Sequence, residues 1–194
     1  MTDAVIAAPV EQYLSLKTVM LTQMTTASMK STTEQFVDRL EEFGVSWTTT
    51  RPDEAETAIT SAVTTPAVGV SPAIDGVSLP PTVEQALSPS TLDAAATGVT
   101  EATLGVADYG SLVIPTTQAG IEPVSLFADQ HIAVLRERDI VPGMDDALAE
   151  RGDAFRTDDW SGIIATGPSA TADMGALVTG AHGPKTVHAI IVQS

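Results

Sequence analysis

The stretch Ser161–Val192, SGIIATGPSATADMGALVTGAHGPKTVHAIIV, restricts the fold of this chain more than any other part of the sequence. Short apolar runs at its two ends, Ile163–Ala165 and Val187–Val192, are typical of buried strands. Two glycine-rich turns, Gly167–Ser169 and Gly180–Pro184, lie between these runs. About twenty residues separate the two runs, which exceeds the dozen or so that a parallel crossover requires. The stretch therefore predicts two strands of one parallel sheet.

The segment after the first turn is expected to carry a binding site. Ser169 or Thr171 can cap a short helix that includes Asp173. In open α/β sheets, ligands bind at the carboxyl ends of the strands. The sequence thus predicts a site at Gly167–Asp173, beside the carboxyl end of the first strand.

Helices and strands also alternate earlier in the chain. The capping-box pattern Ser31–Glu34 starts a helix with apolar residues at helical spacing, which Gly44 ends. Val45–Thr50 is rich in β-branched residues and predicts a strand, and Pro52 opens a second helix. Ala67–Val70 predicts the next strand. This alternation predicts an α/β fold, with a Rossmann-like, mainly parallel sheet and helices on both faces.

Three further elements are expected between these two regions. Thr82–Leu87 is interpreted as one or two helical turns in a surface segment. His131–Leu135 is a compact apolar run that predicts a strand. Met144–Arg151 predicts a helix that ends at Gly152.

The length of 194 residues suits one domain with a substantial core. Folding signals begin only at Ser31, so residues 31–194 are expected to form a single α/β domain. Residues 1–30 carry few charges and no clear start or stop signals for a helix. They are interpreted as an N-terminal arm or a docking helix.

The formal net charge of −16, from 25 acidic and nine basic residues, limits the possible partners. No basic stripe is present to release counterions from a nucleic acid, so a nucleic-acid partner is not expected. Many carboxylates with only three lysines favour an acidic, halophilic protein, because concentrated salt screens the repulsion between carboxylates. An ordinary acidic protein is the alternative.

The chain contains no cysteine. This excludes disulfides, a cysteine nucleophile and a thiolate-held iron–sulfur cluster in this chain. Three scattered histidines give no metal-ligand pattern, so no metal site is expected. No apolar run is long enough for a membrane span and no secretory signal pattern is visible, so we expect a cytoplasmic protein.

Two motifs carry a resemblance to a known family. Gly167–Asp173 followed by Gly180–Pro184 resembles the C-terminal motif of the lactate-utilization protein C family, the single-domain branch of the LUD-domain proteins. Gly105–Ile114 resembles a second motif of that family, in which a Thr-Gly-Thr turn leads into a strand. Here Tyr109 and Ser111 flank Gly110, and the larger Tyr109 leaves the size and identity of a ligand in doubt.

The resemblance implies a fold like that of the ribose-phosphate isomerase and CoA-transferase group. It also implies a role in oxidising L-lactate to pyruvate, as a non-redox subunit or accessory factor. Iron–sulfur partner proteins would hold the redox centres, and this chain would bind no cofactor. Two alternatives remain open: an independent enzyme acting on a small carboxylate or sugar phosphate, and a scaffold without a ligand site.

The candidate site is expected to bind a small anion through backbone N–H groups and hydroxyls. Lys185 is the only basic side chain of the C-terminal stretch and is the expected counter-charge. The candidate ligand-binding residues are Gly167, Ser169, Thr171, Gly180, Gly183, Lys185, Asp108, Gly110 and Ser111.

Asp173 and His182 are the candidate catalytic residues. Asp173 is either a general base or a stabilising charge in the first turn of a helix. His182 is either a proton carrier near neutral pH or a ring that fixes its loop. Neither Walker A nor G-x-G-x-x-G spacing occurs, so no nucleotide site is expected.

Overall fold

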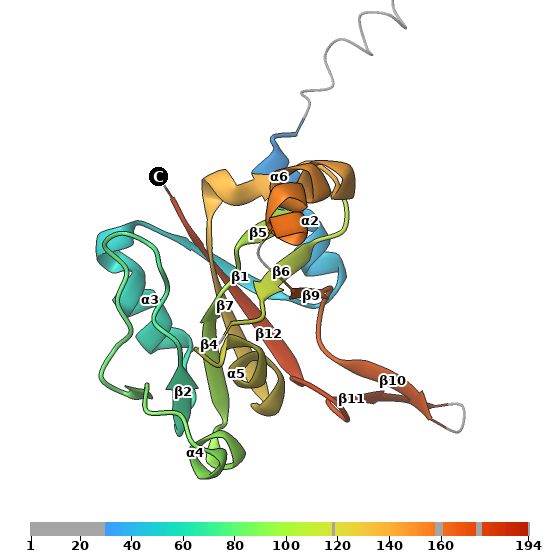
Figure 1. The fold of residues 1–194 in the computed structure, drawn as a ribbon. Coiled ribbons are helices and arrows are strands. Elements are labelled where there is room, and N and C mark those ends of the chain that lie inside the picture. The colour runs from blue at the N-terminus through green and yellow to red at the C-terminus, as the bar shows by residue number, and fades with distance from the viewer. Residues whose placement is uncertain (1–29, 118, 158–160, 174–175, 194) are drawn as a thin grey trace, which may run out of the picture. The chain divides into compact units, whose positions relative to one another are not determined.

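A six-stranded parallel sheet forms the centre of this computed structural model (Figure 1), which describes residues 30–117, 119–157, 161–173 and 176–193. Its strands are β1 (Ser46–Thr50), β2 (Ala67–Gly69), β3 (Val83–Glu84), β4 (Thr97–Glu101), β7 (Gln130–Arg136) and β12 (Thr186–Val192). They lie in the order β1-β12-β7-β4-β2-β3, and every neighbouring pair is parallel. The sheet therefore joins the first and last strands of the described chain side by side.

Helices cover both faces of this sheet. They are α2 (Thr32–Glu42), α3 (Ala55–Ala62), α4 (Pro89–Ala94), α5 (Ile121–Phe127) and α6 (Met144–Thr157), with 3-10 turns at η1 (Pro52–Glu54) and η2 (Glu137–Asp139). Alternate residues of β7 point to opposite faces, as a strand requires. Leu135 packs with Phe36 of α2, whereas Val134 packs with Ile59 of α3. The predicted α/β class, with a mainly parallel sheet between helices, is confirmed.

A second sheet lies against the side of the central sheet that carries α2. It contains β5 (Leu104–Val106), β6 (Ser111–Pro115), β8 (Ile140–Val141) and β9 (Gly162–Ala165), in the order β8-β5-β6-β9. Its β6 is antiparallel to both β5 and β9, and α6 packs on it through Ala147 against Leu104 and Val113. The expected parallel crossover from Ile163–Ala165 to Val187–Val192 is therefore wrong, because the two strands belong to different sheets.

A β-hairpin replaces the short helix expected around Asp173. Its strands are β10 (Ala170–Asp173) and β11 (Ala176–Thr179), paired antiparallel with Ala170 opposite Thr179. The β-branched Thr171, Val178 and Thr179 suit this extended pairing better than a helix. Figure 1 shows the hairpin extending from the body that the two sheets form.

Other boundaries also differ from those expected. The segment Thr82–Leu87 contains β3, an edge strand, rather than helical turns. Helix α6 continues past Gly152, since one glycine costs a helix only about 1 kcal/mol and Arg151 ties this helix to the carbonyl of Thr103. The predicted arm or docking helix at residues 1–30 lies almost wholly outside the described residues, as does residue 194, the last of the predicted domain.

Candidate functional site

The two glycine-rich turns of the C-terminal stretch lie against each other. The N–H of Ser169 donates to the carbonyl of Pro184 over 2.9 Å, and the N–H of Gly180 donates to the carbonyl of Ser169 over 2.8 Å. A Cβ on Gly183 would lie 3.0 Å from the Cβ of Ser169, closer than side chains normally approach. Glycine at position 183 therefore allows the close approach of the two turns.

These turns lie at the amino ends of the central strands, not at the carboxyl ends. The segment that ends at Lys185 leads directly into β12, and Asp129 leads directly into β7. The N–H groups of Lys185 and Thr186 both donate to the carbonyl of Asp129, over 2.7 and 3.1 Å. The expected position at the carboxyl edge of a parallel sheet is thus wrong, because β9, the strand before the first turn, belongs to the second sheet.

A cavity of about 320 Å³ opens beneath the two turns. Its walls come from β6, β9 and α5, and its floor from the first residues of β7 and β12. The lining side chains are mostly apolar, with a few polar groups among them, which is the usual composition of a small-molecule site. Four of the predicted site residues line this cavity: Gly167, Ser169, His182 and Gly183.

Like Ser125, His131 is a buried polar residue of this cavity, with 2% of its surface exposed. Its Nε2 lies 2.8 Å from Oγ1 of Thr100 on β4. Burial lowers the pKa of His131 to about 4, because the charged ring would lose its hydration. The imidazole is therefore neutral at physiological pH. Sequence reasoning missed this residue because its apolar neighbours in the strand predict a core position.

Two consecutive backbone donors of the second turn have no acceptor among the described residues. No described residue accepts a hydrogen bond from the N–H of His182 or of Gly183. Consecutive free N–H groups in a turn form the kind of concave donor set that binds anions. The side chain of His182 is exposed at the same place.

The second motif reaches this region only through Ser111. Its hydroxyl lies 2.7 Å from Oγ1 of Thr166, the residue before Gly167. Gly110, at φ 60°, packs instead against the backbone of α2, where a Cβ would lie 2.8 Å from the Cβ of Arg39. Asp108 accepts a hydrogen bond from Nε2 of Gln35 over 2.6 Å. Asp108 and Gly110 therefore contact α2 and do not line the cavity.

Lys185 does not line the cavity either. Its Nζ lies 2.9 Å from the carboxylate of Asp129, and both side chains are more than half exposed. Thr171 and Asp173 belong to the hairpin strand β10, with Asp173 at the end of that strand. The structure thus brings together the two turns and Ser111, but it does not bring Lys185 into the cavity. The side chain of Asp173 is outside the part of the chain that the structure describes.

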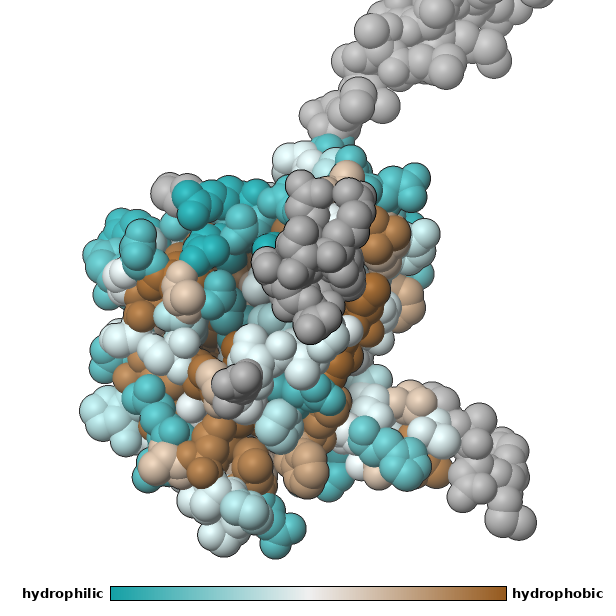
Figure 2. All heavy atoms as spheres, viewed as in Figure 1, coloured by the Kyte–Doolittle hydropathy of each residue, from teal (hydrophilic) through white to brown (hydrophobic). Residues whose placement is uncertain are grey.

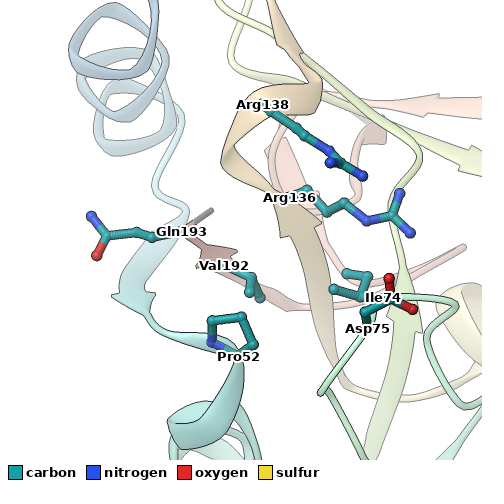
Figure 3. Close-up of a pocket in the computed structure, with 7 residues that line it drawn as sticks. All are labelled: Pro52, Ile74, Asp75, Arg136, Arg138, Val192 and Gln193. Atoms are coloured by element: carbon teal, nitrogen blue, oxygen red, sulfur yellow. The ribbon is translucent and has the colours of Figure 1, made fainter.

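A separate pocket of about 180 Å³ lies at the carboxyl ends of β7 and β12 (Figure 3). Arg136 is held there by Asp139 at 3.1 Å, by Glu101 at 3.7 Å and by the carbonyl of Ala73. Arg138 is more exposed, and its Nε lies 3.9 Å from Asp139. Sequence reasoning passed over this pair of arginines, although their place directly after a buried strand is a usable signal.

Hydrophilic and hydrophobic residues gather on different parts of the surface. Figure 2 shows hydrophilic residues gathered over the carboxyl ends of the central strands, at the upper left, and hydrophobic residues over α5, near the bottom. Among the described residues, no cluster of three His, Cys, Asp or Glu side chains is arranged to hold a metal ion. No described helix combines the length and apolarity of a membrane span.

The fold is that of an α/β protein with a cavity at the amino ends of its central strands. Residues 30–192 match the LUD domain, and the chain therefore belongs to the LUD-domain family. No curated protein matches the chain. A crystal structure of a DUF162 family protein from Deinococcus radiodurans is similar in fold, with a TM-score of 0.61 and 23% sequence identity. The similarity covers 84% of this chain and 99% of that chain.

Proposed function

We propose that this chain is a non-redox subunit or accessory factor of an L-lactate utilization system, and that it binds a small anion in the cavity of the two glycine turns. The observation that carries the proposal is the convergence of both turns on one cavity of about 320 Å³ within a LUD domain. Membership of the LUD-domain family supports the link to lactate utilization.

The chemistry of the cavity supports a small carboxylate as the anion. The N–H groups of His182 and Gly183, from which no described residue accepts, supply donors without a full charge. The cavity has no lysine or arginine among its described lining residues, and His131 is neutral. A singly charged carboxylate suits such a site better than a phosphate with two negative charges, which would need a counter-charge.

The redox centres of the system belong to partner proteins in this proposal. The chain has no cysteine with which to hold an iron–sulfur cluster. Iron–sulfur proteins of the same system are therefore the expected partners, and this chain binds no cofactor of its own.

The first experiment tests the partners. The tagged chain is purified from its native host at the salt concentration of its cytoplasm, and co-purifying proteins are identified by mass spectrometry and iron content. Iron–sulfur proteins in stoichiometric amounts support the proposal. If these proteins are absent from repeated preparations in which the tagged chain is folded, the proposal of a subunit or accessory factor is wrong. A scaffold and an independent enzyme then remain as the candidate functions.

The second experiment tests the cavity. Binding of acetate and of phosphate is measured by NMR titration for the wild-type chain and for Gly183→Ala. The added methyl would press on Ser169 and separate the turns, so acetate binding should weaken about tenfold. Gly44→Ala is the control, because its methyl would have no atom within 4 Å. Equal loss of binding in both variants would contradict the site.

An independent enzyme acting on a small carboxylate or sugar phosphate is the second candidate. The pocket beside Arg136 and Arg138 favours it, since arginines at the carboxyl ends of parallel strands suit anionic substrates. Phosphate binding that is lost in Arg138→Ala but kept in Gly183→Ala would favour this candidate.

A further inference from the structure

We propose that His131 contacts the ligand in the cavity of the glycine turns, and that the cavity thereby selects small organic acids that carry a hydroxyl group. This inference rests on the proposed function, because it takes the carboxylate site at the turns as its starting point. It adds a specificity-determining residue that lies outside both glycine motifs.

The imidazole of His131 has one nitrogen fixed and one nitrogen free. Nε2 lies 2.8 Å from the hydroxyl of Thr100, which sets the plane of the ring. Nδ1 has no hydrogen-bond partner among the described residues. Because His131 lines the cavity and its Nε2 is engaged by Thr100, Nδ1 is the ring nitrogen left to contact a ligand there.

A neutral ring in this position recognises a ligand by hydrogen bonding and not by charge. A buried polar atom that faces a cavity is costly unless a partner arrives, either water or a ligand. Within the described part of the lining, no cationic side chain competes for the ligand. His131 therefore discriminates between ligands by whether they bring a neutral hydrogen-bonding group to the floor of the cavity.

A hydroxyl is the group that suits this floor. If Nε2 of His131 donates to Thr100, Nδ1 accepts, and if Nε2 accepts, Nδ1 donates. A ligand hydroxyl pairs with either tautomer, whereas a carbonyl pairs with only one. Ser125, also on the cavity wall, donates its own proton to the carbonyl of Glu122 over 2.7 Å. With its proton engaged, the Ser125 oxygen can only accept from a ligand in the cavity, which again suits a ligand hydroxyl.

Glycolate and acetate are the matched probes, because they share a carboxylate and differ by one hydroxyl. One net hydrogen bond between neutral groups predicts that glycolate binds about fivefold more tightly than acetate near neutral pH. The chain is labelled with ¹⁵N in its three histidine rings, and the wild-type protein is titrated with each acid. The signals are assigned from His182→Gln and His188→Gln, each of which lacks one ring.

The expected result is a change in the Nδ1 shift of His131 with glycolate and a smaller change with acetate. His131→Leu should reduce glycolate affinity to the level of acetate. His188→Gln is the matched control, since His188 lies on the opposite face of the sheet and bonds Ser46 over 2.8 Å. His188→Gln should leave the ratio of glycolate affinity to acetate affinity unchanged.

The outcomes separate this inference from the proposed function. Equal binding of both acids, with the His131 signal unmoved, overturns the inference and leaves the carboxylate site standing. If neither acid binds, both the inference about His131 and the proposed carboxylate site are overturned. Because the wild-type titration reads His131 directly, the result does not depend on whether His131→Leu folds.

Discussion

Nε2 of His131 lies 2.8 Å from Oγ1 of Thr100, so a buried ring on β7 is joined to the neighbouring strand β4. This pair lies on the face of the sheet that forms the cavity floor. Nε2 makes this structural contact, whereas Nδ1 has no partner among the described residues. Burial of the ring also makes the free energy of unfolding depend on pH, with a definite sign.

The first prediction concerns that pH dependence. Burial lowers the pKa of His131 from 6.5 to about 4, so the unfolded chain binds a proton more readily than the native one. The contribution of neutral His131 to the free energy of unfolding should be fully present above about pH 6.5. It should fall by roughly 3 kcal/mol as the pH drops towards 4. Burial also lowers the pKa of His188, which adds a loss of the same sign.

Urea unfolding of the wild-type chain and of His131→Asn, at several pH values in this window, measures the contribution of His131. The variant should lose about 3 kcal/mol less than the wild type over the window. Parallel curves for the two proteins would contradict the prediction, since the remaining carboxylates and histidines are common to both.

The second prediction concerns the packing of α5 on the sheet. A Cβ on Gly98 of β4 would lie 2.0 Å from the carbonyl oxygen of Val124 in α5. Gly98→Ala should therefore push the helix off the sheet and lower the free energy of unfolding by about 3 kcal/mol or more. Gly44→Ala should cost only about 1 kcal/mol, for its positive φ alone. Similar losses in urea unfolding would show that α5 does not pack as described.

The third prediction concerns Lys185 and Asp129. As an exposed ion pair it should contribute less than about 1 kcal/mol to stability. If Lys185 assists an anion at the neighbouring turns, Lys185→Ala should weaken acetate binding roughly two- to fivefold, and Asp129→Asn should strengthen it. Both effects should vanish at about 1 M salt. If the acetate affinity changes in the same direction in both variants, charge is not the cause of the change.

The fourth prediction concerns salt and stability. The net charge of −16 opposes folding through repulsion, which ions screen. The midpoint of thermal unfolding should climb between about 0.1 M and about 3 M KCl. A flat or falling midpoint would remove the halophilic interpretation of the composition.

The fifth prediction concerns cofactors. The chain purified without its partners should contain no stoichiometric iron, flavin or nucleotide, because it lacks cysteine and the nucleotide-binding motifs. Metal analysis and the visible spectrum measure this directly. A visible absorption band that survives dialysis would contradict the prediction.

Much of the secondary structure followed from local signals. The capping box at Ser31–Glu34 and the helix breaker Gly44 enclose α2, and Gly44 adopts a φ of 72° as a helix-ending glycine does. The β-branched runs became β1, β7 and β12 within a residue or two. These features are predictable because they depend on residues close together in the chain.

The placement of the site was less predictable, because it depends on which strands share a sheet. Ile163–Ala165 and Val187–Val192 have similar apolar sequences, yet β9 pairs with β6 while β12 pairs with β1 and β7. No local pattern distinguishes these partners. The two glycine turns were found from sequence, whereas their position at the amino edge of the sheet and the role of His131 required the tertiary structure.

The place of β12 in the sheet also affects when the domain can form in a growing chain. β1 has β12 as its neighbour, although about 135 residues separate them. At roughly 5 to 20 residues per second, β1 waits about 7 to 27 s for that partner during translation. In this interval its hydrogen-bonding edge is open to incorrect pairing. The hydroxyls of Thr48–Thr50 make this waiting strand less apolar than the central strands β7 and β12.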